Sequence, residues 1–100
     1  MNTRITDPIG RSITLHDRTW FGHIVKGHPD IAAHRDLVEP AIANPNQIRL
    51  SNAGPEGRLY FGTGPRVGIM VVVVVDVELA LVKTAHLARK PSGGAVEWPS

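Results

Sequence analysis

Arginine, tyrosine, threonine and histidine side chains on two predicted strands are the strongest candidates for chemistry in this chain. Alternation along a strand places Arg58 and Tyr60 on one face of the segment RLYFGT, and Thr84 and His86 on one face of the segment KTAH. If the two faces coincide, one surface collects a guanidinium, a phenol, a hydroxyl and an imidazole. Such a set suits a phosphodiester, because arginine binds phosphate in bidentate fashion, histidine exchanges protons near neutral pH and tyrosine stacks on bases. Polar residues on a half-solvated sheet are equally expected without any function.

Two more histidines, His23 and His28, stand near the end of a predicted helix. Residues five apart on an ideal helix point about 140° from each other, so this pair would not bind one metal ion from a single face. The chain also lacks cysteine and the HExxH spacing of zinc enzymes, and we expect neither a metal site nor a cofactor. For His23 a general-base role and a structural role are both open, and His28 could cap the helix C-terminus. His28 and Lys83 complete the candidates, as residues that bind substrate.

The composition favours one globular domain. The apolar fraction is 42% and the charged fraction is 20%, values typical of ordinary globular proteins. The net charge of +2 is too small to indicate a nucleic-acid partner by itself. The absence of cysteine and of an apolar N-terminal segment agrees with a cytoplasmic protein. The apolar run 67–82 is interrupted by Asp76 and Glu78, so we expect no membrane span.

The apolar run 67–82 is also the segment around which the rest of the chain should pack. Val71 to Val75 are consecutive valines, and β-branched residues favour a strand because they suit a pleated sheet. The lack of polar alternation predicts burial on both faces. Other strands are predicted at 47–50, 58–63 and 79–86. In the second of these, we expect Leu59 and Phe61 to face the helices.

Proline and glycine positions mark the elements of the first half. The turn DPIG predicts a hairpin over 4–15. Asp17 offers an N-cap for a helix that Pro29 should end at the preceding residue. A second helix is expected to end at residue 43. Because Pro40 lies inside it, either this helix kinks or a new short helix begins with the proline in its first turn.

The expected architecture is an α+β domain, with helices in the first half and strands in the second. It comprises a hairpin at 1–16, two helices at 17–43 packed on one face of a four-stranded antiparallel sheet at 46–87, and an irregular tail at 88–100.

An ordered set of short motifs resembles one known group of proteins. The motifs are W-x-x-H-I-x-x-x-H-P-D, A-I-x-N-P-x-x-I, L-Y-F, a valine-rich strand, T-A-H and G-x-x-x-W, carried here by Trp20, His23, Ile24, His28, Pro29, Asp30, Ala41, Ile42, Asn44, Pro45, Ile48, Tyr60, Thr84, Ala85, His86 and Trp98. Their order over residues 5–98 resembles small phage- and plasmid-associated proteins of the BECR nuclease superfamily, which unites barnase-like, EndoU-like, colicin-like and RelE-like ribonucleases.

This resemblance implies helices followed by a four-stranded antiparallel sheet, and RNA cleavage without a metal ion. The ribose 2′-hydroxyl would attack the adjacent phosphate, one group taking its proton and another protonating the leaving 5′ oxygen. Carried onto this chain, His23 would transfer a proton, Arg58 would clamp the phosphate, Thr84 would contact phosphate or ribose, and Tyr60 would stack a base. His86 stands where many relatives carry tyrosine, which either adds an acid or base or marks a degraded site.

The resulting hypothesis is a metal-independent endoribonuclease, for example the toxin of a toxin–antitoxin system. Its partners would be transfer RNA or ribosome-associated RNA and an antitoxin or immunity protein. The alternative is a catalytically silent module on the same fold that binds RNA or protein. A third hypothesis is a homodimer formed through an exposed edge strand.

Overall fold

The consecutive valines lie in β5 (Met70–Asp76), the fourth strand of a seven-stranded sheet with the order β1-β2-β6-β5-β4-β3-β7. The computed structural model describes residues 2–100. The other strands are β1 (Thr3–Thr6), β2 (Ser12–Leu15), β3 (Gln47–Leu50), β4 (Gly57–Thr63), β6 (Leu81–Ala88) and β7 (Val96–Trp98). Val71, Val72 and Val73 are all buried. The predictions of an α+β fold and of a central valine strand, covered on both faces, are confirmed.

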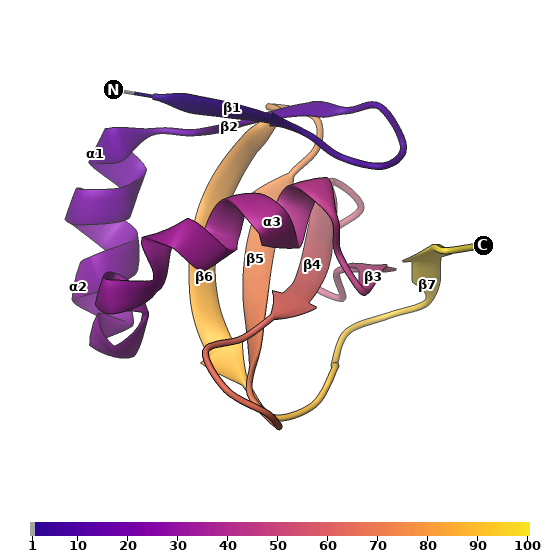
Figure 1. The fold of residues 1–100 in the computed structure, drawn as a ribbon. Helices are drawn as coiled ribbons and strands as arrows, with labels where there is room; N and C mark the ends of the chain where they lie inside the picture. Colours follow the sequence, from indigo (N-terminus) through magenta and orange to yellow (C-terminus); the bar gives the residue numbers. More distant parts are fainter. Residues whose placement is uncertain (1) are drawn as a thin grey trace.

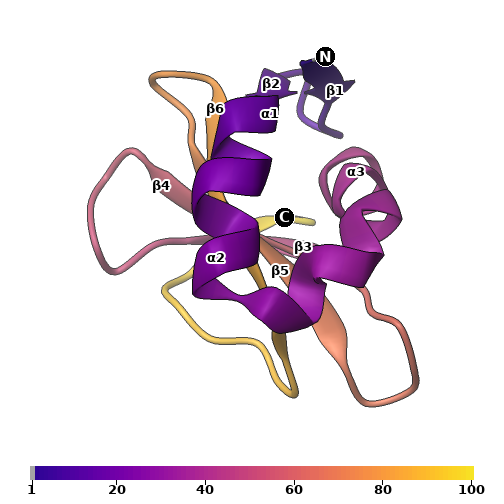
Figure 2. The ribbon, with the colours of Figure 1, turned by 90° about the vertical axis from the view of Figure 1, so that its left-hand side faces the viewer.

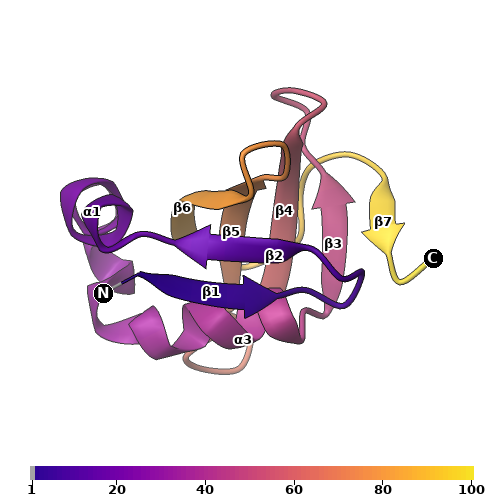
Figure 3. The same cartoon turned by 90° about the horizontal axis from the view of Figure 1, so that it is seen from above.

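The sheet is larger than the predicted four strands, and it is mixed rather than antiparallel throughout. The N-terminal hairpin joins it by a parallel pairing of β2 with β6 at Thr14 and Leu81. The tail, expected to be irregular, adds β7 antiparallel to β3. Figure 3 shows both additions, the hairpin across one end of the sheet and β7 beside β3. The sequence analysis missed both pairings because the partner strands are distant in sequence. In addition, the three residues of β7 are too few to show the alternation of a strand.

The first predicted helix is one continuous segment with an unusual middle. It consists of α1 (Asp17–Thr19), the π-helical turns of η1 (Trp20–Ile24) and α2 (Val25–Gly27). His28 leaves helical geometry with φ of −137° directly before Pro29, so the predicted end is confirmed. The helix begins one residue earlier than predicted, because His16 rather than Asp17 occupies the N-cap.

The second helical segment contains two pieces. The 3₁₀ turns of η2 (Pro29–Leu37) break at His34 and lead into α3 (Val38–Ala43). Pro40 lies in the first turn of α3, where a missing N–H is tolerated. Of the two alternatives left open by the sequence, the new short helix is the observed one. Among residues 2–100, no helix is long and apolar enough to cross a membrane.

The helices lie in two places around the sheet: α3 crosses the face of β4 and β5, and the α1 to α2 segment lies beside β6 (Figures 1 and 2). In β4, a Cβ atom at Gly62 would be 2.5 Å from the Cβ of Ala41 in α3. Glycine is therefore required where this helix crosses. Tyr60 is two residues earlier, on the same face, and is fully buried. The prediction that Leu59 and Phe61 face α3 is wrong, because they occupy the alternate positions of the strand.

Candidate functional site

The four residues predicted to share one face of the sheet lie on two faces. In register, Tyr60 pairs with Val73, and Thr84 pairs with the next residue of β5. Successive residues of a strand point to opposite faces, so Tyr60 and Thr84 are on opposite sides of the sheet. Arg58 lies on the face of Tyr60, and His86 lies on the face of Thr84. The predicted common surface is therefore not formed, and Tyr60 is too buried to stack an RNA base.

Arg58 and Tyr60 belong instead to an anchoring network with Asp7, Arg11 and Glu97. The Tyr60 hydroxyl donates a hydrogen bond to Oδ2 of Asp7. Arg11 donates from Nε to the same oxygen at 2.8 Å and from Nη2 to Oε1 of Glu97 at 2.6 Å. Arg58 donates from Nε to Oε2 of Glu97 at 2.8 Å. The network ties the turn of the N-terminal hairpin to β4 and β7, which are remote from it in sequence.

The anchoring network fixes the charge of its own members. Burial would raise the pKa of Asp7, but hydrogen bonds from Tyr60 and Arg11 outweigh burial and lower that pKa. The pKa of Glu97 is also lowered, because the opposite effect of burial is outweighed by the hydrogen bonds from Arg11 and Arg58. Burial and the hydrogen bond to Asp7 raise the pKa of Tyr60. Near neutral pH both carboxylates therefore stay charged and the phenol stays neutral. The guanidinium of Arg58 is ion-paired with Glu97 and is not free to bind a phosphate.

A second polar group, the histidine cluster, consists of His28, Asp30, Arg66, His86 and Arg89. The rings of His28 and His86 are adjacent, with their centroids 5.4 Å apart and their planes inclined by 34°. Asp30 is close enough to act electrostatically on His86. Asp30 also lines a small pocket together with Arg66 and Arg89. Asp30 thus links the histidine pair, on which it acts electrostatically through His86, to the pocket that the two arginines line.

The backbone around His28 explains how this side chain is positioned. Its N–H donates to the carbonyl oxygen of Ile24 at 2.8 Å, and its own carbonyl oxygen accepts from the N–H of Ile31 at 3.0 Å. Pro29 prevents the first helix from continuing. His28 is therefore held at the junction of α2 and η2, facing His86 of β6.

His86 is the member of the cluster whose protonation is most altered by its surroundings. Partial burial lowers its pKa, the neighbouring His28 lowers it further, and the carboxylate of Asp30 acts in the opposite direction. The net effect favours the neutral imidazole, which is the form that accepts a proton. A lowered pKa is a recurrent property of catalytic bases.

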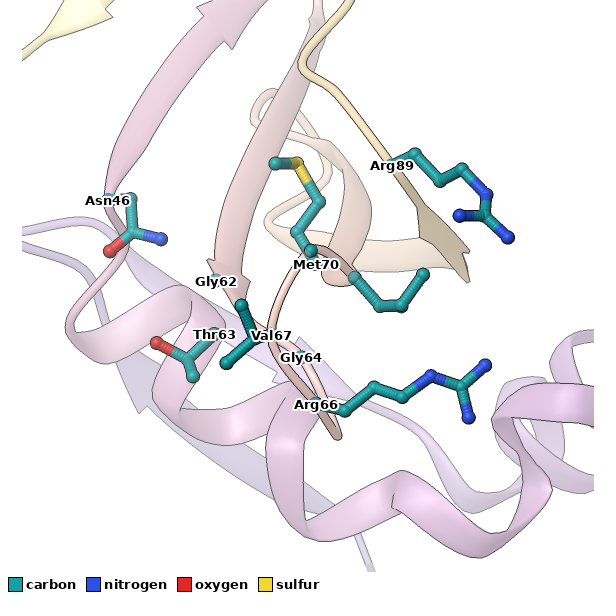
Figure 4. Close-up of a pocket in the computed structure, with 10 residues that line it drawn as sticks. Asn46, Gly62, Thr63, Gly64, Arg66, Val67, Met70 and Arg89 are labelled. Carbon is teal, nitrogen blue, oxygen red and sulfur yellow. The ribbon is translucent and has the colours of Figure 1, made fainter.

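Two pockets adjoin at the arginines of the cluster. The smaller, of about 220 Å³, is lined by Asp30, Arg66, Ile69, Leu87, Ala88 and Arg89. The larger, of about 420 Å³, shares Arg66, Ile69 and Arg89 with it and extends over the loop between β4 and β5 (Figure 4). Both arginines are exposed, and within residues 2–100 neither side chain makes a hydrogen bond or an ion pair. Their charge is available to an anionic ligand.

Sequence reasoning named both histidines of the cluster but missed Asp30, Arg66 and Arg89 as site residues. Arg66 lies in the loop GPRVG, and Arg89 begins the dipeptide RK directly after β6. Neither position belongs to a periodic pattern, and only their basic character at element ends could have suggested them.

The remaining candidates lie outside the histidine cluster. His23 is exposed on η1. Lys83 is exposed near the beginning of β6, at a register shift, whereas Arg89 follows the end of that strand. The hydroxyl oxygen of Thr84 is buried and has no hydrogen-bond partner in the described part of the chain. Of the predicted catalytic and substrate-binding residues, the structure brings His28 and His86 together in the histidine cluster, and Arg58 and Tyr60 together in the anchoring network.

Comparison of the chain with known protein families, with curated proteins and with solved structures gave no match. Within residues 2–100, no three histidine, aspartate or glutamate side chains are grouped so that they could hold a metal ion.

Proposed function

We propose that the protein cleaves RNA by attack of the ribose 2′-hydroxyl on the adjacent phosphate, with the histidine cluster as its active site. The observation that carries the proposal is the contact between the rings of His28 and His86, 5.4 Å apart, beside a pocket lined by two unpaired arginines. The BECR resemblance supports the same reaction, although the roles that it implied for His23, Arg58 and Thr84 are assigned here to other residues.

In this mechanism His86 is the general base. Its lowered pKa keeps the imidazole neutral, so it can take the proton from the 2′-hydroxyl as that oxygen bonds to phosphorus. His28 gives a proton to the 5′ oxygen as the bond from phosphorus to that oxygen breaks. The products are a 2′,3′-cyclic phosphate and a free 5′-hydroxyl, and the two histidines have exchanged protonation states. Asp30 stabilises whichever imidazole is charged.

The arginines supply positive charge to the reacting phosphate. Negative charge builds on the non-bridging oxygens in the transition state, and fixed cations lower its energy. Arg66 and Arg89 come from different segments, the loop between β4 and β5 and the end of β6. Both line the two adjoining pockets, so two guanidiniums can bind one phosphate.

The test is incubation of the pure protein with total RNA and transfer RNA in EDTA, followed by analysis of the fragment ends. We expect cyclic phosphate ends, and a loss of at least about a hundredfold in rate for His86→Ala and for His28→Ala. His23→Ala is the matched control, because it removes an exposed imidazole outside the cluster and should leave the rate unchanged. Because the pKa of His86 is lowered, the rate should remain high below pH 6.5, the ordinary value for histidine.

Unchanged cleavage in both cluster variants, or loss of cleavage when EDTA is added, would contradict the proposal. RNA binding without cleavage by folded protein would favour the silent binding module. The roles of toxin and homodimer, and an antitoxin partner, stay predictions from the sequence.

A further inference from the structure

The larger pocket has two chemically different halves. Figure 4 shows Asn46, Thr63 and Val67 on one side, with Arg66 and Arg89 extending toward the other. The pocket measures about 420 Å³, which exceeds the volume of a single nucleobase. Its arginine end is shared with the small pocket of the histidine cluster. A ligand that bridges both pockets would place an anionic group at the arginines and an uncharged group beside Asn46.

The uncharged half offers apolar contact and one hydrogen-bonding group. Val67 is fully exposed at the tip of the loop between β4 and β5, with a relative accessibility of 103%. Met70 also lines the pocket. Asn46 uses its backbone N–H to bond the carbonyl oxygen of Phe61 at 2.7 Å, while its side-chain amide bonds no described residue. The amide can donate and accept at once, as recognition of a base edge requires.

Close backbone packing requires glycine at two positions of the pocket lining. A Cβ atom at Gly64 would be 1.9 Å from the carbonyl oxygen of Ile69 across the hairpin. At Gly62 the neighbouring helix leaves no space for a side chain. Both positions are therefore restricted to glycine for reasons of the fold, and neither contributes a side chain that would fill the pocket.

We propose that this pocket binds one unpaired nucleobase of single-stranded RNA, next to the phosphate held by Arg66 and Arg89. The inference rests on the proposed function, since it assigns the nucleotide that flanks the reacting phosphate. Val67 and Met70 pack against the faces of the base, and the amide of Asn46 bonds its edge. Bases in a duplex have their edges paired and their faces stacked, so the protein selects RNA whose bases are free.

Binding can be tested apart from cleavage, with 2′-O-methyl oligonucleotides, whose blocked hydroxyl prevents the reaction. Fluorescence anisotropy would compare the four short homopolymers with an abasic strand of the same length. We expect the preferred homopolymer to bind roughly tenfold tighter than the abasic strand, near the low end of the scale for a base stacked on an aromatic side chain, because Val67 and Met70 are aliphatic. Asn46→Ala should reduce differences among the four bases severalfold, because a bidentate amide contact discriminates on that scale.

Asn52→Ala is the matched control, since it removes an exposed amide from the loop between β3 and β4, and it should change no affinity. Equal affinity for the abasic strand and all homopolymers, alongside normal cleavage of RNA, would overturn the base pocket and leave the proposed function standing. Base-dependent binding that is sensitive to Asn46→Ala, without any cleavage, would support the pocket and overturn the nuclease. Absence of binding to every strand would overturn the pocket.

Discussion

The anchoring network and the histidine cluster contain similar side chains but differ in how their charges are paired. In the network, Asp7 has no exposed side-chain surface, and each guanidinium is bonded to a carboxylate. In the cluster, the side chains of Arg66 and Arg89 are exposed and bond no described residue. Charges that the fold has paired stabilise it, whereas charges left unpaired around a pocket are available to a ligand. The comparison thus distinguishes a structural polar group from a candidate active site.

Strand β4 connects the two regions. Arg58 and Tyr60 lie in its first half and belong to the anchoring network, and Thr63 at its end lines the larger pocket. The strand therefore fixes the pocket loop to the same framework that holds the hairpin and β7. Substitutions in the network should act on stability, and substitutions at the cluster should act on RNA.

The largest expected effect is that of Asp7→Ala on stability. This change removes a buried carboxylate and leaves the hydroxyl of Tyr60 and the guanidinium of Arg11 without their partner. Breaking a buried ion pair from one side costs about 3–5 kcal/mol, which urea unfolding followed by circular dichroism would measure. Asp36→Ala, at an exposed carboxylate of η2, is the control. A loss below about 1 kcal/mol, the range of surface ion pairs, would show that the network does not anchor the hairpin.

The next effect is expected on cleavage rather than on folding. The double variant Arg66→Ala with Arg89→Ala should reduce the cleavage rate about a hundredfold, the scale of removing one group that stabilises the transition state. The slope of log affinity for RNA against log salt should also decrease by about 0.7 for each phosphate that the variant no longer neutralises. The free energy of unfolding should stay unchanged, because neither side chain has a partner among the described residues.

Arg4→Ala with Arg18→Ala removes the same charge from exposed positions away from the histidine cluster. If this control reduced cleavage as strongly as the cluster double variant, general attraction of RNA to a basic protein would explain both results.

The carboxylates of the network predict how stability depends on pH. Folding lowers the pKa values of Asp7 and Glu97 from ordinary values of 3.8 and 4.5. A lowered pKa contributes stability that is present above the ordinary value and is lost as the pH falls through the lowered one. The melting temperature should therefore fall from pH 5 toward pH 3. Glu97→Gln should cost about 1.5 kcal/mol at pH 7, the low end for a hydrogen bond to a charged group, because the amide oxygen still accepts, and the cost should be smaller at pH 3. An equal cost at both pH values would exclude the charge of Glu97 as the cause.

Local signals in the sequence predicted the elements well, and distant partners explain what they missed. Valines predicted the central strand, and prolines predicted where the helices end. The orientation of Tyr60 depends on Asp7, which comes from the hairpin turn. The three-residue β7 depends on pairing with β3 and on the two arginines that bind Glu97. Contacts of this kind, between residues far apart in sequence, produce no local pattern in the sequence.

The candidate site shows the same limit. His28 and His86 could be named from their chemistry, but their contact depends on how α2 lies beside β6. The register shift at Lys83 and the pairing of β4 with β5 decide which residues share a face. Arg66 and Arg89 stand at element ends, where alternation gives no direction for a side chain.

The smallest expected effect concerns Thr84, which belongs to neither region. Its hydroxyl oxygen is buried and unpaired among the described residues, so Thr84→Val should raise the free energy of unfolding by up to about 1 kcal/mol, since a buried polar atom without a partner is destabilising. Cleavage should be unchanged, because the histidine cluster does not include this residue. Thr6→Val, on an exposed position of β1, controls for the general effect of valine in a strand. Loss of cleavage at unchanged stability would instead show that Thr84 contacts RNA, as the BECR resemblance implies, and would extend the active site along β6 beyond the histidine pair.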